Sequence, residues 1–145
     1  MTNRERADLL FAEAPGIAEE MRRSLDRQRW NLAARRAQEV IELVVKGLLT
    51  EMGVEYPRTH DAAPVLIEAI QRRHIDTDAE FLEWLSGHSG RLAGIRGPAF
   101  YHEIQVGENE AREAVQAADR VLAFGQDFLA QLRAKARAPE GEPPG

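Results

Sequence analysis

Apolar residues recur at three- and four-residue steps along most of the chain, a spacing that places them on one face of an α-helix. The clearest stripe lies in residues 30–52, and a second long stripe lies in residues 110–136. The first consists of Ala33, Ala37, Val40, Ile41, Val44, Val45, Leu48, Leu49 and Met52. The alternating pattern of a β-strand is absent from the sequence. We therefore predict an all-α protein, an up-and-down bundle of four to five helices.

The N-terminal part of the chain predicts a helix with an interruption. Helical periodicity runs through residues 3–13 and 17–29, but Pro15 lies between them and is followed by glycine. Proline removes a backbone donor from a helix, so we expect a break or kink at this point. The strong helix over residues 30–52 is followed by Gly53, which suits a helix C-terminus.

Start signals mark the remaining helices. Thr59 is the expected cap of a third helix, with Asp61 in its first turn. A fourth begins over residues 78–85, and we expect it to be short or irregular because four glycines follow in residues 87–97. Asn109 is the expected cap of the last long helix.

Length and composition indicate one ordinary globular unit. We predict a single helical domain over residues 1–136 of the 145 and a disordered tail, rich in proline and glycine, over residues 137–145. The sequence lacks a run of about 18 apolar residues, so we expect no membrane span. It also lacks cysteine and an apolar signal segment, which favours a cytoplasmic protein.

Charge is unevenly distributed along the chain. The net charge of −5 argues against a protein that simply coats nucleic acid. Residues 20–36, however, contain six arginines against Glu20 and Asp26. This patch could attract a phosphate backbone. It could equally be a solvated helix face whose arginines pair with acidic neighbours.

Metal and phosphate-loop motifs are not found. The histidines at 60, 74, 88 and 102 have unrelated flanking residues and no ligand partner at helical spacing, so we expect no metal and no cofactor. The glycines at 87, 90, 94 and 97 lack the Gly-Lys-Ser/Thr ending of a phosphate loop and are better explained as a hinge or loop.

The stretch RGPAFYH at residues 96–102 is the one candidate for chemistry. Pro98 suits the first position of a helix, which would make Gly97 its N-cap and leave free N–H groups beside Arg96. His102 could then remove the proton of a ribose hydroxyl while Arg96 stabilises charge on phosphorus. Tyr101 could stack on a base or fill the core. Arginine is so abundant here that the spacing alone does not separate this site from a turn.

Four stretches together resemble the HEPN family. They are the helix WNLAARRAQEVIELVVKGLL, the turn YPRTHDAAPVLIEAI, then RGPAFYH and the closing helix EAREAVQAADRVLAF. Each motif is weak, but their order and spacing over about residues 5–130 are fairly specific. The resemblance implies a helical bundle that forms a homodimer and acts with a minimal nucleotidyltransferase, often as a toxin–antitoxin module.

The resemblance also implies an activity. Many HEPN proteins are metal-independent endoribonucleases whose arginine and histidine, four to six residues apart, meet at the dimer interface. Arg96 and His102 match that spacing and are our predicted catalytic residues, with Gly97, Tyr101 and His60 as predicted nucleotide- or RNA-binding residues. The alternative is a non-catalytic module that binds a nucleotide or scaffolds and neutralises its partner. His60 belongs to the Thr-His-Asp turn, whose other expected role is to cap a helix.

Overall fold

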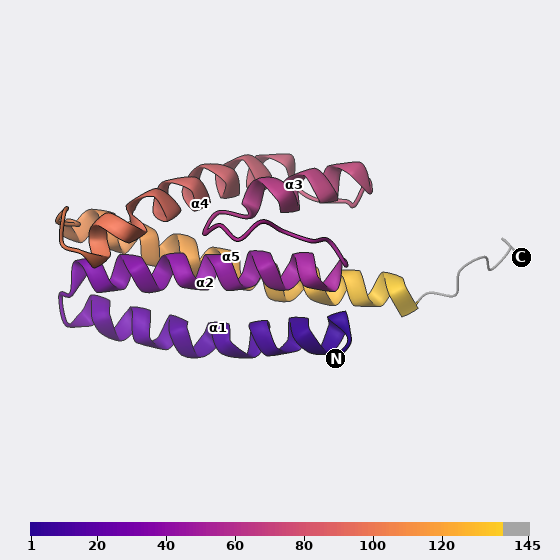
Figure 1. Cartoon of the computed structure of the whole chain (residues 1–145), viewed down its shortest axis with the longest axis horizontal. Coiled ribbons are helices and arrows are strands. Elements are labelled where there is room, and N and C mark those ends of the chain that lie inside the picture. Colours follow the sequence, from indigo (N-terminus) through magenta and orange to yellow (C-terminus); the bar gives the residue numbers. More distant parts are fainter. Residues whose placement is uncertain (138–145) are drawn as a thin grey trace, which may run out of the picture.

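The computed structural model describes residues 1–137, and these form five α-helices and no β-strand, as the periodicity predicts. Figure 1 shows the helices lying lengthwise along one another in a bundle. Their bounds are α1 Asn3–Asp26, α2 Trp30–Glu51, α3 Ala63–Arg72, α4 Ala79–Phe100 and α5 Glu108–Arg137. The chain turns from α1 to α2, and again from α4 to α5, at the same end of the bundle (Figure 1).

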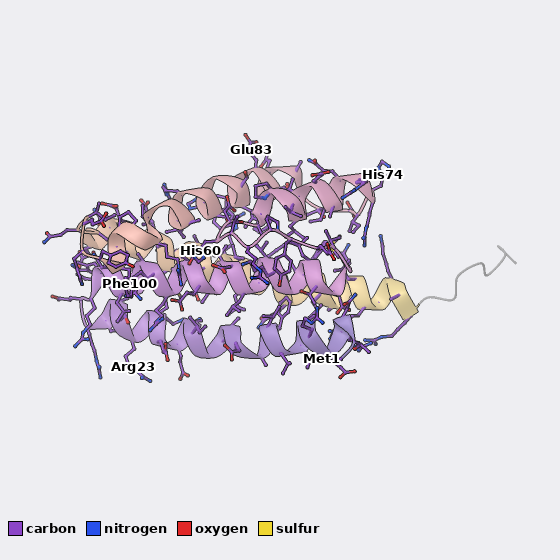
Figure 2. All side chains as sticks on the ribbon, viewed as in Figure 1. Met1, Arg23, His60, His74, Glu83 and Phe100 are labelled. Atoms are coloured by element: carbon purple, nitrogen blue, oxygen red, sulfur yellow. The ribbon has the colours of Figure 1, made fainter. Side chains whose placement is uncertain are left out.

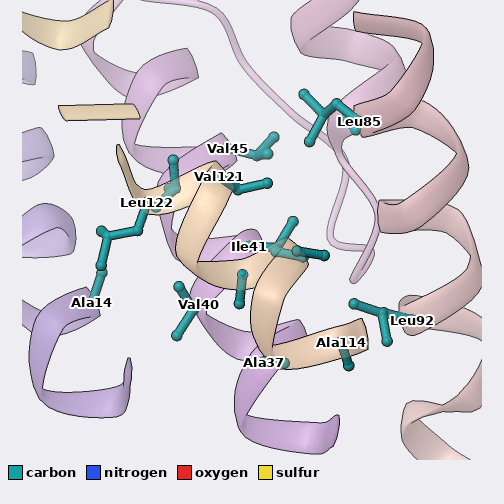
Figure 3. Close-up of a cluster of buried hydrophobic side chains, with 14 of the residues drawn as sticks. Ala14, Ala37, Val40, Ile41, Val45, Leu85, Leu92, Ala114, Val121 and Leu122 are labelled. Atoms are coloured by element: carbon teal, nitrogen blue, oxygen red, sulfur yellow. The ribbon is translucent and has the colours of Figure 1, made fainter. Parts of the chain in front are cut away.

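Helix α2 lies at the centre of the bundle and packs against all four other helices. Its apolar stripe, predicted from the sequence, is buried along its whole length. Figure 3 shows Val40, Ile41 and Val45 of this stripe among side chains from α1, α4 and α5. Burying a side chain of this size stabilises the fold by about 1.5–3 kcal/mol, so this stripe is a main source of stability.

Two glycines allow the helices around α2 to approach closely. A Cβ on Gly47 of α2 would lie 2.7 Å from the Phe11 ring of α1. A Cβ on Gly125 of α5 would overlap the side chain of Val44 on α2. The close packing of α2 against α1 and of α2 against α5 therefore requires glycine at these two positions.

The predicted break at Pro15 and the predicted short fourth helix are both wrong. Helix α1 runs unbroken through Pro15, whose exposed ring lies on the outer face while Ala14 and Ala18 are buried. Helix α4 is also continuous across its glycines, because its buried face, from Phe81 to Ala99, packs on the bundle. In both helices tertiary packing outweighs the local cost of proline or glycine.

Two predicted helix starts are also wrong. Thr59 is not the cap of α3, which begins at Ala63 with Ala62 in the cap position. Asp61 takes over the capping role from outside the helix, because its carboxylate accepts a hydrogen bond from the N–H of Ala63 at 3.2 Å. Helix α5 begins at Glu108, so Asn109 lies inside its first turn.

Four helix ends share one geometry. Each is followed by a residue in the left-handed region, and the next N–H bonds back to a carbonyl five residues earlier. After α2 this residue is Gly53 (φ 70°), as the sequence predicts. After α1, α3 and α4 it is Gln28, His74 and His102, with φ of 60°, 52° and 55°. Left-handed geometry costs a residue with a Cβ about 1–2 kcal/mol, so these three positions carry backbone strain.

The predicted disordered tail falls outside the described residues, apart from Arg137, which is the last residue of α5. In the described part of the chain, none of the five helices combines the length and the apolar character needed to cross a bilayer.

Candidate functional site

His102 lies in the tight turn that ends α4. The helix ends at Phe100, and the backbone N–H groups of His102 and Glu103 bond back to Ala99 (3.4 Å) and Pro98 (2.9 Å). The imidazole is exposed and, within residues 1–137, makes no hydrogen bond. A histidine on a strained turn at the surface is free to meet a ligand.

The anion site predicted at Gly97 is wrong. Gly97 is not a helix N-cap but lies inside α4, and its carbonyl accepts the N–H of Tyr101 at 3.1 Å. Pro98 is accommodated in the last turn of the same helix. The free N–H groups expected beside Arg96 are therefore absent from this stretch. Nothing contacts a Cβ built on Gly97, so its surroundings are open.

Asn31, in the first turn of α2, fastens the His102 turn to the bundle. Its side-chain amide donates to the carbonyls of Ala99 (3.2 Å) and Ile104 (2.9 Å). Its side-chain oxygen accepts the N–H of Val106 at 2.8 Å. One side chain thus satisfies backbone groups on both sides of His102 and fixes where that residue sits.

His102 borders a pocket of about 450 Å³ at the N-terminus of α2. Arg29 and Arg35 line the same pocket, and the first turn of α2 contains no acidic residue. The guanidinium of Arg35 lies 4.3 Å from the ring centroid of Phe100. Burial, followed by the nearby charge of Arg36, lowers the pKa of Arg35 from its ordinary value. The pocket therefore combines positive charge with a group that can accept a proton.

Arg96 does not face this pocket within one protomer. Its Nη1 lies 3.1 Å from Nε2 of His60, and its Nη2 lies 3.8 Å from a carboxylate oxygen of Glu39. Its Nε is buried and has no hydrogen-bond partner among the described residues. Arg96 and His102, predicted as a pair, are thus not brought together within one protomer: Arg96 contacts His60, and His102 borders the pocket.

His60 links Arg96 to a polar cluster on α2. Its Nδ1 lies 2.9 Å from Glu42, which also accepts from Lys46 and Gln38 at 2.9 Å each. Because the arginine N–H donates to Nε2, the ring proton belongs on Nδ1, facing Glu42. Burial would raise the pKa of Glu42, but hydrogen bonds from Gln38, Lys46 and His60 outweigh it and lower the pKa. Figure 2 shows His60 between α2 and α4.

The other two residues of the Thr-His-Asp turn have structural contacts. Asp61 accepts a hydrogen bond from the hydroxyl of Ser89 on α4 at 2.7 Å, in addition to the N–H of Ala63. The Thr59 hydroxyl donates to the Asp61 carbonyl at 3.1 Å. These bonds fasten the loop before α3 to α4 and so hold His60 near Arg96. Over residues 1–137, no cluster of three or more potential metal ligands occurs.

Pairing with acidic neighbours accounts for two of the six arginines in residues 20–36, and attraction of a phosphate backbone by this segment stays a prediction. Arg22 pairs with Asp119 (2.6 Å), and Arg36 pairs with Glu20 (3.3 Å) and Glu39 (3.0 Å). The other four form no ion pair with any residue in the described part of the chain; these are Arg23, Arg27, Arg29 and Arg35. Arg23 and Phe100 lie toward the same end of the bundle (Figure 2).

Sequence reasoning missed several residues around His102. Asn31 was visible as part of the Asn-Leu-Ala-Ala motif, but its bonds join residues about 70 positions apart and leave no local pattern. Arg35 was one of six arginines with nothing to distinguish it. Tyr101, predicted to stack on a base or fill the core, is 71% exposed and meets the 51% exposed Phe100 edge to face, so it does not fill the core, and stacking on a base stays a prediction.

Comparison with known families gives one result. The family model described as HEPN domain matches residues 7–128, which confirms the resemblance drawn from the motifs. Neither the curated proteins nor the solved structures contain a match to this chain.

Proposed function

The chain belongs to the HEPN family, and from this premise we propose that it acts as a homodimeric, metal-independent endoribonuclease. The observation that carries the proposal is the position of His102, exposed on the rim of a pocket that Arg29 and Arg35 also line. Positive charge attracts the phosphates of RNA, and a neutral imidazole accepts a proton near physiological pH.

The proposed reaction is an internal transesterification. His102 takes the proton of a ribose 2′-hydroxyl, the 2′-oxygen forms a bond to phosphorus, and the bond from phosphorus to the 5′-oxygen breaks. The leaving 5′-oxygen takes up a proton from the partner's His102. The products are a 2′,3′-cyclic phosphate and a 5′-hydroxyl, with no oxidant or metal consumed. Arginine stabilises the charge that develops on the phosphate oxygens.

Dimerisation has a specific role in this proposal. Arg96 has the family spacing to His102, but in one protomer it contacts His60 instead. A second protomer, with its own copy of the 96–102 stretch, would bring arginine and histidine to one phosphate. Tyr101, exposed at the same turn, would stack on a base, whereas Gly97 would only leave room for the RNA backbone.

The test is cleavage of total RNA by the purified protein in EDTA, which removes contaminating metal-dependent nucleases. We expect wild-type protein to cleave RNA and to leave 2′,3′-cyclic phosphate ends. We expect His102→Ala to lower the rate by about 10²–10⁴-fold, the usual contribution of a general base. His74→Ala is the matched control, because His74 also follows a helix in a left-handed conformation. Equal cleavage by the two variants would refute the proposed role of His102.

We also propose a protein partner, a minimal nucleotidyltransferase, in a toxin–antitoxin-type module. Family membership supports this proposal, since such pairing is what the resemblance implies. The test is co-expression with a small nucleotidyltransferase encoded beside this protein. We expect the two to co-purify and the RNase activity to fall in the complex. A nucleotidyltransferase that neither binds the protein nor alters its activity would contradict the pairing.

One observation favours the alternative, a non-catalytic nucleotide-binding or scaffolding module. Arg96 is engaged by His60 and lies 3.8 Å from Glu39, so its charge is partly neutralised inside the protomer. This alternative predicts that purified dimer cleaves no RNA while the nucleotidyltransferase still binds it.

A further inference from the structure

We propose that Arg35, an arginine outside the Arg96…His102 spacing, is the residue that contacts the RNA phosphate beside His102. The inference rests on the proposed function, because it names the phosphate-binding group of that same site. It differs from the expectation drawn from the family spacing, which gives this contact to Arg96.

Arg35 shares a pocket with His102, and Arg96 does not. Arg35, in the second turn of α2, and His102, in the turn after α4, line the same pocket. Asn31, one helical turn earlier on α2, bonds to the backbone on both sides of His102. The same helix therefore positions both the guanidinium and the turn that carries the imidazole. A phosphate in the pocket would lie between them.

The charge of Arg35 lacks a carboxylate partner in the described part of the chain. The nearby carboxylate is Glu39, but it is bonded to Arg36 at 3.0 Å and also lies 3.8 Å from Arg96. Arg36 also pairs with Glu20 at 3.3 Å, so two carboxylates, Glu20 and Glu39, serve the three arginines Arg35, Arg36 and Arg96, and neither forms an ion pair with Arg35. Burial and the charges of Arg36 and Arg96 lower the pKa of Arg35, while Glu39 opposes them. A bound anion would supply the missing negative charge.

The guanidinium of Arg35 is held in place before any ligand arrives. It lies over the Phe100 ring with 4.3 Å to the ring centroid, an arrangement in which cation and ring attract each other. Stacking engages the face of the guanidinium and leaves its N–H edge available for hydrogen bonds. Arg29 lines the same pocket but is exposed at the helix N-cap, and no described residue bonds to its side chain. Arg35 is therefore the better prepared phosphate contact.

The experiment compares Arg35→Gln with wild type and two further variants. Arg35→Lys keeps the charge but loses the planar fork. Arg73→Gln removes one exposed arginine from the end of α3, at the opposite end of the bundle, and is the charge-matched control. Two readouts are used: cleavage of RNA, and anisotropy of a labelled, fully 2′-O-methylated RNA 12-mer that cannot be cleaved. Circular dichroism establishes that each variant is folded.

We expect Arg35→Gln to weaken binding of the methylated 12-mer by about 10–100-fold, the usual effect of losing a charged hydrogen bond. The slope of log Kd against log salt should fall by about one, as for one lost phosphate contact. Arg35→Lys should restore the salt slope but not the cleavage rate. Arg73→Gln should match wild type in both readouts.

The outcomes separate the inference from the proposed function. If Arg35→Gln binds and cleaves like wild type while His102→Ala does not cleave, the inference is overturned and the ribonuclease stands. If wild type cleaves nothing but binds the 12-mer, and Arg35→Gln loses that binding, the anion contact stands and the ribonuclease falls. If wild type does not bind the 12-mer, the inference is overturned.

Discussion

Two arginines at opposite ends of the bundle have opposite surroundings. Near the C-terminal end of α5, Arg133 donates to Glu51 of α2 at 2.9 and 3.1 Å and to Asp8 of α1 at 2.7 Å. Its side chain is only 14% exposed, and the hydrogen bonds that it donates to Glu51 and Asp8 raise its pKa above the ordinary value. At the other end, Arg35 has a lowered pKa and, within the described part of the chain, the ring of Phe100 in place of a carboxylate partner.

The comparison distinguishes an arginine that stabilises the fold, Arg133, from one that we propose binds a ligand, Arg35. Arg133 joins three helices, and its positive charge is compensated twice over within the chain. Arg35 lies among other arginines, whose charges outweigh that of Glu39, and among residues 1–137 its side chain forms no ion pair and contacts the ring of Phe100. Apart from the contact with the ring, Arg35 therefore adds little to the stability of the fold, as we expect of a charge that binds a ligand.

The largest expected effect is at Arg133. Arg133→Met should lower the free energy of unfolding by about 3 kcal/mol, because it leaves the half-buried Glu51 without its cation. Arg35→Met should cost at most about 1 kcal/mol, the value of a cation–π contact. Urea unfolding of both variants measures the difference. An equal loss of unfolding free energy in the two variants would mean that Arg35 stabilises the fold as much as Arg133 does, which would contradict this distinction.

The second prediction concerns the seam between α2 and α5, which belongs to the tightly packed region around Arg133. Gly125→Ala should destabilise the protein by about 1–3 kcal/mol, because the new methyl group overlaps the stiff side chain of Val44. Gly94→Ala, on the open side of α4, meets nothing within 4 Å and should stabilise by about 0.5–1 kcal/mol. Thermal unfolding of the pair tests this, and effects of the same sign would contradict it.

A third prediction concerns the turn after α4 that carries His102. Asn31→Ala removes three hydrogen bonds to the backbone around His102 and should cost about 1–3 kcal/mol. Hydrogen exchange should speed up in residues 99–106 and stay unchanged in α5. Asn109→Ala, on the outside of the first turn of α5, should change neither quantity. Unchanged exchange in residues 99–106 would show that Asn31 does not hold the turn.

Sequence patterns predicted the long helices well because these depend on a repeated signal. Every apolar position of the α2 stripe contributes to the same conclusion, and burial confirms it. The interruptions at Pro15 and in α4 were mispredicted because one proline or a few glycines weigh little against a buried face. Local propensity is a weak guide wherever packing on a neighbour decides.

The candidate site was harder to predict because its contacts are not local. The partner of Arg96 is His60, 36 residues away, and a spacing argument searches only its sequence neighbours. The capping role assigned to Thr59 belongs to Asp61, two residues later, because helix boundaries shift easily by that much. The catalytic role of Arg96 and His102 stays a prediction.

The smallest expected effect concerns the three residues with positive φ, and it tests whether the strained conformation of any of them serves a function. Gln28, His74 and His102 all have positive φ after a helix end, and all three are exposed. Replacement by glycine should stabilise each by about 0.5–1 kcal/mol, since glycine adopts this conformation without a Cβ clash. Stability of the three variants is measured by urea unfolding and activity by cleavage of RNA. Gln28→Gly and His74→Gly should keep the wild-type rate, whereas His102→Gly should gain stability and lose cleavage. Normal RNA cleavage by the His102→Gly variant would show that His102 has no more functional importance than Gln28 or His74.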